Sequence, residues 1–194
     1  MPILEMREAS FRRDGSTLLA PVSMTLDCGA RAELTCETNV AAGIAARLAA
    51  GICKCTDGSV FVADFDPKIQ PVQVKALVGF LPSERPRNPL PADEYFAYRA
   101  ALWGLNKTAT LQKGHALLAM LDGLEPGEAA LLAGMFLHDP RLLVLERPRD
   151  GLRDAAETLK AVIPPSALLV TYGPSDRAAL GIHAQSREVG TTPS

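Results

Sequence analysis

Cysteine and histidine are the side chains in this sequence that could hold a metal ion. The four cysteines are Cys28, Cys36, Cys53 and Cys55. Two thiolates at the spacing of Cys53 and Cys55 suit a soft metal ion, but a closed tetrahedral site needs four ligands. The three histidines, which have no paired spacing, are His115, His138 and His183. We therefore expect no metal site, and we expect reduced thiols that are buried or have no role.

Carboxylates are the other candidates for chemistry. Glu37, Glu125 and Glu128 could be interpreted as an acid/base cluster. We interpret them instead as solvated charges in loops.

The composition is typical of one globular domain with little net charge. The chain has 194 residues, 47% hydrophobic and 22% charged, with a formal net charge of -2. A domain of this length buries roughly 70% of the surface that its unfolded chain would expose, so it needs no disulfide or metal for stability. The near balance of charges argues against a nucleic-acid or anionic-membrane role. No apolar run approaches the ~18 residues of a membrane span, and the N-terminal residues lack the order of a signal peptide, so we expect a cytoplasmic chain.

The first part of the chain predicts antiparallel strands followed by a helix. Short alternating stretches occur at residues 3–6, around 10–11, at 22–26 and at 31–35. Breaks at Asp14-Gly15 and Cys28-Gly29 favour a meander. A helix is expected over 40–52, a strand over 59–62, and a buried apolar segment over 76–81.

The rest of the chain predicts a helical block and then a strand-helix-strand unit. Apolar periodicity favours helices over 92–103 and 111–121, and a third from Pro126 to about residue 138. The aliphatic runs at 142–145 and 167–171 are typical of parallel strands buried on both faces. A helix over about 154–162 joins them as a crossover.

In this order the elements resemble the nucleotide-binding domain of ATP-binding-cassette (ABC) transporters, in the style of the exporter and gliding-type branch. The segments that carry the resemblance are LEMREASFRRDGSTLLAPVSMTLDCGARAELT, GSVFVADFDP, VGFLPSERPRNPL with DEYFAYRAALWGL, FLHDPRLLVLERPRDGL, and ALLVTY. They cover nearly the whole chain. The resemblance implies one domain over 1–194, with a P-loop NTPase-like α/β fold. It would contain an N-terminal antiparallel β subdomain, a mostly parallel core sheet and a reduced helical subdomain over about 83–138.

The family's phosphate loop, GxxxxGK[ST], aligns with the octet from Cys36 to Gly43. In such loops the glycines let backbone N–H groups surround the phosphates, the lysine meets the β- and γ-phosphates, and the hydroxyl binds magnesium. Here Ala42 stands at the lysine position and Gly43 at the hydroxyl position, while Cys36 and Ala41 replace the glycines. Glu37 adds negative charge where the phosphates would lie. The resemblance therefore implies no bound nucleotide and no other cofactor.

The family's hydrolytic positions also differ. Glu146 stands at the magnesium carboxylate, but the general-base glutamate is replaced by Arg147, which stays protonated. Tyr172 takes the position of the switch histidine, and Arg13 that of the adenine-stacking aromatic residue. We expect no catalytic residue and no ATPase activity.

The residues at the signature and Q-loop positions differ from the family's as well. The family's signature LSGGQ is at best residues 124–128, LEPGE, in which glutamate, proline and glutamate replace a serine, a glycine and the glutamine. The Q-loop glutamine falls on Ser83 or Glu84.

Five of the chain's ten aromatic residues, Phe80, Tyr95, Phe96, Tyr98 and Trp103, fall within a short span. Core packing accounts for any single ring. In the family, however, the cleft between the Q-loop and the helical subdomain receives the coupling helix of a membrane subunit, so the resemblance implies a partner-binding groove. Its expected residues are Phe80, Pro82, Ser83, Glu84, Tyr95, Phe96 and Tyr98.

Together these features predict an inactive ATPase-like subunit of a membrane transporter complex. It would be peripheral on the inner face of the cell membrane, docking a transmembrane permease, a sister cassette or both, with no nucleic-acid partner and no direct membrane insertion. A soluble regulatory or scaffold protein with the same fold is one alternative, favoured by a groove that the chain itself fills. An atypical ATP-binding subunit that uses Glu146 and the helix start near Asn39 as a weak anion site is another.

Overall fold

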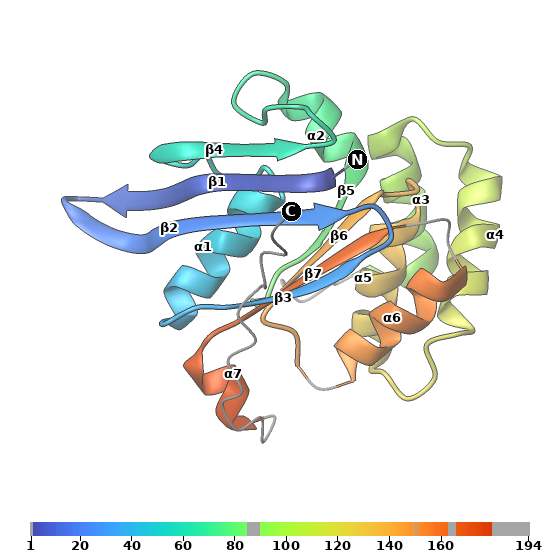
Figure 1. The fold of residues 1–194 in the computed structure, drawn as a ribbon. Helices are drawn as coiled ribbons and strands as arrows, with labels where there is room; N and C mark the ends of the chain where they lie inside the picture. The colour runs from blue at the N-terminus through green and yellow to red at the C-terminus, as the bar shows by residue number, and fades with distance from the viewer. Residues whose placement is uncertain (1, 85–89, 150, 163–165, 180–194) are drawn as a thin grey trace.

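The structure is a computed structural model that describes residues 2–84, 90–149, 151–162 and 166–179. It contains an antiparallel sheet, a parallel sheet and helices packed around them (Figure 1). The predicted α/β fold class, with an antiparallel N-terminal sheet and a parallel core sheet, is confirmed. Residues 85–89 of the expected helical subdomain and His183 lie outside the described residues.

The antiparallel sheet consists of a long hairpin and a third strand. β1 (Pro2–Arg13) pairs with β2 (Ser16–Asp27) on one side and with β4 (Asp57–Val62) on the other. The two strands predicted around 3–6 and 10–11 are one strand. Register shifts after Met6 and after Ala9 absorb the breaks in the alternating pattern.

The stretch over 31–35 does not belong to this meander, and that prediction is wrong. β3 (Arg31–Thr35) pairs in parallel with β7 (Ala167–Tyr172) at the edge of the second sheet. Its residues alternate between exposed and half-buried, because one face of the strand is covered and the other is open. Alternation therefore does not separate a parallel edge strand from an antiparallel one.

The parallel sheet has the strand order β3-β7-β6-β5. β5 is Val78–Leu81 and β6 is Leu142–Glu146. All residues of β6 and β7 are buried, which confirms the two predicted aliphatic strands. Each strand runs one residue further than expected, to Glu146 and to Tyr172, so both of these polar residues lie within the sheet.

Helix α1 (Asn39–Ala49) lies between the two sheets (Figure 1). It packs against β1, β2 and β4 on one side and against β6 and β7 on the other. Its buried residues are mostly alanines, whose small side chains let both sheets approach the helix. The predicted helix over 40–52 is therefore present, with a shorter C-terminal end.

A block of helices covers the opposite face of the parallel sheet. It contains α3 (Ala92–Trp103), α4 (Lys107–Leu118), α5 (Pro126–Phe136) and α6 (Leu152–Val162). The bounds of α3 agree with the prediction. α4 begins earlier than the predicted 111–121, because the side chain of Asn106 caps its N-terminus.

Two short helices were not predicted, α2 (Pro71–Leu77) and α7 (Pro174–Ala179). Each begins at a proline, which suits the first turn of a helix. The apolar segment over 76–81 is divided between the end of α2 and β5. None of the helices in the described part of the chain is both long and apolar enough to cross a membrane.

Candidate functional site

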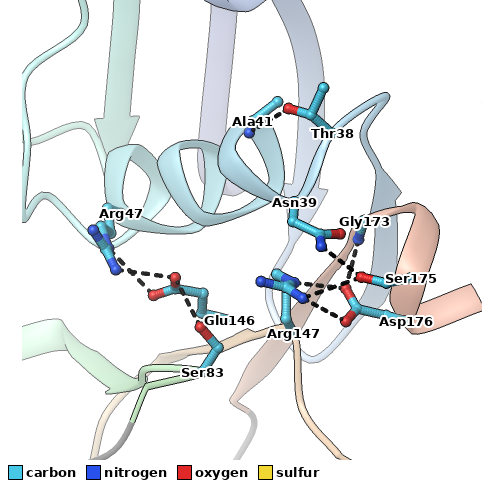
Figure 2. Close-up of polar contacts among 10 residues, drawn as sticks. All are labelled: Thr38, Asn39, Ala41, Arg47, Ser83, Glu146, Arg147, Gly173, Ser175 and Asp176. Carbon is cyan, nitrogen blue, oxygen red and sulfur yellow. Dashed lines mark hydrogen bonds and ion pairs between the residues drawn. The ribbon is translucent and has the colours of Figure 1, made fainter. Parts of the chain in front are cut away.

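The C-terminal ends of β3, β6 and β7 meet beside the N-terminus of α1, and open α/β sheets bind ligands at such an edge. Predicted residues gather here from segments far apart in the chain. Figure 2 shows the polar contacts among them and their neighbours. The two polar clusters of this edge are centred on Glu146 and on Arg147.

The loop between β3 and α1 is short, and the amides around it are hydrogen-bonded within the protein. α1 begins at Asn39, so residues 36–38 alone separate strand from helix. The Thr38 hydroxyl caps α1 by accepting from the Ala41 amide at 3.0 Å, and the Thr38 carbonyl accepts from the Ala42 amide at 3.0 Å. The Cys36 amide donates to the Tyr172 carbonyl at 2.9 Å. These three amides are therefore already used within the protein.

Glu146 is buried in an ion pair. Its side chain is 3% exposed, and the Arg47 guanidinium donates to both carboxylate oxygens, Nε to Oε2 at 3.2 Å and Nη2 to Oε1 at 3.1 Å. The Ser83 hydroxyl donates to Oε1 at 3.2 Å. Both oxygens of the predicted magnesium position are therefore bound by protein donors (Figure 2).

Arg47 is the residue of this cluster that sequence reasoning missed. It follows Gly43 by one helical turn on α1, so the two residues share the face that meets Glu146. A Cβ atom added at Gly43 would lie 2.8 Å from Glu146 Oε1. The sequence does hold a pattern that indicates this ion pair. A small residue and a cation lie at i and i+4 on a helix, and a lone acidic residue ends a buried strand.

Arg147 forms a second ion pair, with Asp176 of α7. Nε donates to Oδ2 at 2.7 Å and Nη2 donates to Oδ1 at 2.9 Å, while the Gly173 amide donates to Oδ2 at 2.7 Å. Burial alone would raise the pKa of Asp176, but the hydrogen bonds from Arg147 and Gly173 lower it below its usual value. The hydrogen bond to Asp176 raises the pKa of Arg147. The Arg147–Asp176 ion pair therefore holds the end of β6 against the start of α7.

Asn39 joins this second cluster from the first residue of α1. Its Nδ2 donates to the Ser175 hydroxyl at 2.5 Å. Its Oδ1 lies against Gly173, where an added Cβ would collide with it, and that oxygen has no hydrogen-bond partner in the described residues. The helix start near Asn39 is thus packed against the beginning of α7.

Tyr172 is not brought to these clusters. Successive side chains of a strand point to opposite faces. Tyr172 packs in the core beside α6, whereas Gly43, Arg47 and Glu146 lie on the α1 face of the sheet. Burial raises the pKa of Tyr172, and nearby Arg153 partly opposes this rise. The tyrosine at the predicted switch position is therefore a packing residue of the other layer.

Glu146 and Asp176 are each paired with an arginine, so neither can bind a cation without breaking an ion pair. In residues 2–84, 90–149, 151–162 and 166–179, no group of three His, Cys, Asp or Glu side chains is placed to hold a metal ion. Burial, helped by the charge of Glu37, raises the pKa of Cys36 to about 11. The Cys36 thiol is thus protonated at neutral pH and a poor nucleophile.

Solved structures with this architecture are ATP-binding parts of ABC transporters. An ATP-binding subunit of an ABC transporter has a TM-score of 0.68 at 16% identity, covering 88% of this chain and 79% of that one. The protein cbiO1 from Clostridium perfringens, part of the ABC transporter complex cbiONQ, has a TM-score of 0.69 at 14% identity, covering 88% and 78%. A putative ABC transporter ATP-binding protein from Pyrococcus furiosus has a TM-score of 0.63 at 18% identity, covering 88% and 96%. The chain has the fold of an ABC nucleotide-binding domain. No protein-family model and no curated protein matches the sequence.

In the segment that was predicted to replace the signature, the N-terminus of α5 is capped by a carboxylate of the chain itself. Glu125 is the N-cap and its Oε2 accepts from the Glu128 amide at 3.1 Å, with Pro126 in the first turn. Glu128 pairs with Arg149. A negative charge therefore already lies at the positive end of the helix dipole.

The groove expected between the Q-loop segment and the helical block of the ABC fold coincides with a cavity of about 330 Å³. Phe80, Pro82 and Tyr95 line it. Phe96 does not, because it is 0% exposed and packs tightly against Gly114 of α4. Tyr98 is 56% exposed but lies outside this cavity.

The two remaining groove predictions also lie outside this cavity. Ser83 is engaged with Glu146 rather than with the groove, and Glu84 is exposed. Trp103, one of the five clustered aromatic residues, also lines the cavity, and lining residues that sequence reasoning missed include Ile52, Lys75 and Arg99. Ile52 and Lys75 could not be placed from local pattern, because they come from segments outside the helical block.

A second cavity, of about 500 Å³, lies between β2 and the loop that precedes α1. Apolar residues of β2 form one wall, and Cys36, Glu37 and Thr38 lie on the loop side. Space therefore exists beside the loop that precedes α1, and the charged residue among its lining residues, Glu37, is acidic.

Proposed function

We propose that this chain is a non-catalytic ABC-type subunit, a pseudo-ATPase that serves as a structural adaptor in a membrane transporter complex. The observation that carries the proposal is the Arg47–Glu146 pair. The Arg47 guanidinium binds both oxygens of the carboxylate that would otherwise hold magnesium.

Enzymatic phosphoryl transfer depends on positioning and on charge stabilisation by lysine, magnesium and backbone donors. Ala42, at the predicted lysine position, is 0% exposed and has no charged group to offer to a phosphate. Magnesium could reach Glu146 only by displacing Arg47 and Ser83. Arg147, at the general-base position, is paired with Asp176.

The segment expected to replace the signature, which would face the ATP of a partner cassette, also opposes phosphate binding. The Glu125 carboxylate lies where the signature helix of a cassette would offer its N-terminus to a phosphate. A phosphate there would meet like charge. The chain would therefore complete neither its own ATP site nor that of a partner cassette.

An adaptor role rests on the surface that remains. The 330 Å³ groove is not filled by the described part of the chain, which favours docking over a self-capped scaffold. The similar protein cbiO1 is part of a transporter complex. We infer that this chain docks a transmembrane permease, a sister cassette or both, and lies at the cytoplasmic face of the membrane through them.

Two measurements test the proposal. Calorimetric titration of the full chain with ATP and magnesium should show no binding, and micromolar affinity would contradict the pseudo-ATPase. Affinity purification from native membranes should recover an integral membrane protein with the chain. Recovery of a free soluble monomer alone would contradict the adaptor role, whatever the titration shows.

A further inference from the structure

One face of α3 supplies polar groups to the cavity of about 330 Å³ beside this helix. Tyr95, Arg99 and Trp103 line the cavity at intervals of four residues, so they lie along the same face of α3. The lining residues from β5 and α5 are apolar, among them Phe80 and Met135. The cavity therefore combines apolar walls with a row of side chains that carry a hydroxyl, a guanidinium and an indole N–H group.

The charged residues that line this cavity are both basic. Arg99 comes from α3 and Lys75 from α2, and none of the described lining residues is acidic. Among the residues that the structure describes, no ion pair involves either of these two cations. Positive charge beside apolar walls, with no carboxylate of the chain to neutralise it, favours an anionic occupant.

Arg99 is positioned by stacked rings. Its guanidinium carbon lies 5.9 Å from the ring centroid of Trp103, and the Trp103 and His138 rings stack with centroids 4.6 Å apart and an interplanar angle of 10°. His138 Nε2 lies 3.1 Å from the Val78 carbonyl, which holds this ring in turn. Arg99 Nε is a buried donor without a hydrogen-bond partner in the described part of the chain. A guanidinium held in this way is suited to the paired oxygens of a carboxylate or phosphate group.

The charge of Arg99 acts on the interior of the cavity. Burial raises the pKa of Tyr95, and the positive charge of Arg99 partly opposes this rise. Arg99 therefore favours negative charge on a neighbouring residue of the lining, and it would favour an anionic group of a ligand there for the same reason.

We propose that this cavity binds a small amphipathic anion, whose apolar body contacts β5 and α5 and whose carboxylate or phosphate group pairs with Arg99, with Lys75 adding to the attraction. The volume of about 330 Å³ lies within the range of roughly 300–1,000 Å³ that is typical of small-molecule sites. The two cations supply the specificity, because an amine with the same apolar body would meet like charge. The site needs neither a nucleotide nor a partner chain, so it goes beyond the proposed adaptor function, and a partner docked over this groove would compete with the ligand.

The fluorescence of Trp103 tests the proposal directly, because Trp103 is the only tryptophan of the chain and lines the cavity. The purified full chain is titrated with octanoate and with octyl phosphate, and calorimetry measures the same affinities independently. At least one of these anions should change the fluorescence saturably, and the one that binds more tightly identifies the anionic group. Octylamine and octanol, which have the same chain length, should bind at least about tenfold more weakly.

Variants of the two cations test the assigned contacts. Arg99→Gln should weaken anion binding at least about tenfold, because a charge-assisted contact is lost, and Arg99→Lys should weaken it less. Lys75→Gln, at an exposed position, should weaken binding about two- to fivefold, and it keeps the test decisive if thermal melts show that Arg99→Gln does not fold. The matched control is Lys107→Gln, an exposed lysine of α4 outside the cavity, which should change the affinity less than about twofold.

Any of three results overturns the inference. Neither anion binds, or octylamine or octanol binds as tightly as the anions, or the folded Arg99 and Lys75 variants bind the anions as tightly as the unaltered chain. These results would leave the proposed adaptor function standing, since that function is tested separately by titration with ATP and by purification from native membranes.

Discussion

Gly43 on α1 lies directly against the carboxylate of Glu146 at the end of β6, where an added Cβ would be 2.8 Å from Oε1. Gly43, which was predicted at the hydroxyl position of a phosphate loop, thus leaves the space into which a buried carboxylate fits. One turn later on the same helix, Arg47 neutralises that carboxylate. Helix α1 and strand β6 are held together here by the Gly43–Glu146 contact and the Arg47–Glu146 ion pair.

Gly43→Ala should destabilise the protein by about 1–3 kcal/mol, because the added methyl group overpacks the contact with Glu146. The opposite sign is the usual expectation, since alanine is favoured over glycine by about 1 kcal/mol within a helix. Urea denaturation measures the free energy of unfolding. Ala109→Gly, at an exposed position in the first turn of α4, serves as the comparison and should cost at most about 1 kcal/mol. Stabilisation by Gly43→Ala would contradict the close contact.

Arg47→Ala should lower the free energy of unfolding by about 2 kcal/mol, because Glu146 would stay buried with only Ser83 as a partner. The loss is expected below the ~3–5 kcal/mol of a fully buried pair, since the Arg47 side chain is 45% exposed. Replacing both partners, as Arg47→Met with Glu146→Leu, should recover most of the loss. The control is Arg13→Ala, an arginine 74% exposed, which should change stability by less than about 0.5 kcal/mol. Equal stabilities of Arg47→Ala and Arg13→Ala would show that the pair is not formed.

Asp176→Asn should remove a pH-dependent part of the stability. The pKa of Asp176 is lowered in the folded protein by its hydrogen bonds to Arg147 and Gly173, despite its burial. The stability it contributes is therefore fully present above its usual pKa of about 3.9 and is lost as the pH falls toward the lower folded-state pKa. Urea midpoints of the two proteins should differ at neutral pH and converge below about pH 4. A difference that stays constant over this range would contradict the shift.

The cysteines should react in an order set by burial and by the pKa of each thiol. Burial raises the pKa of Cys36 to about 11 and that of Cys53 to about 11, and Arg47 partly opposes the rise at Cys53. Cys28 is exposed. Because the thiolate is the reactive form, iodoacetamide at neutral pH should modify Cys28 first and Cys36 and Cys53 more slowly. Mass spectrometry of the labelled peptides, with Cys28→Ser as the control, reads the order. Equal labelling of Cys36 and Cys28 in the folded protein would refute it.

Local sequence pattern predicted well the strands that are buried in the same way on both faces. The aliphatic runs of β6 and β7 are buried on both faces, and a buried parallel strand has no other composition. β3 was misplaced because an edge strand alternates in either kind of sheet. Phe96 was expected in the groove, because an aromatic side chain does not itself indicate whether it faces a groove or the core. It is buried against Gly114, and that contact depends on the packing of α3 against α4.

Sequence alone identified the side chains that are expected at the catalytic positions of the ABC fold: Ala42 and Gly43 in the phosphate loop, and Glu146 followed by Arg147. The contacts that these side chains make depend on the three-dimensional packing. Arg47 and Glu146 are 99 residues apart in the chain, and Arg147 and Asp176 are 29 apart. Their pairing depends on how α1 and α7 pack against the sheet. Tyr172 points away from both pairs because its position in β7 sets its face, and strand register is fixed by the packing of the whole sheet rather than by neighbouring residues.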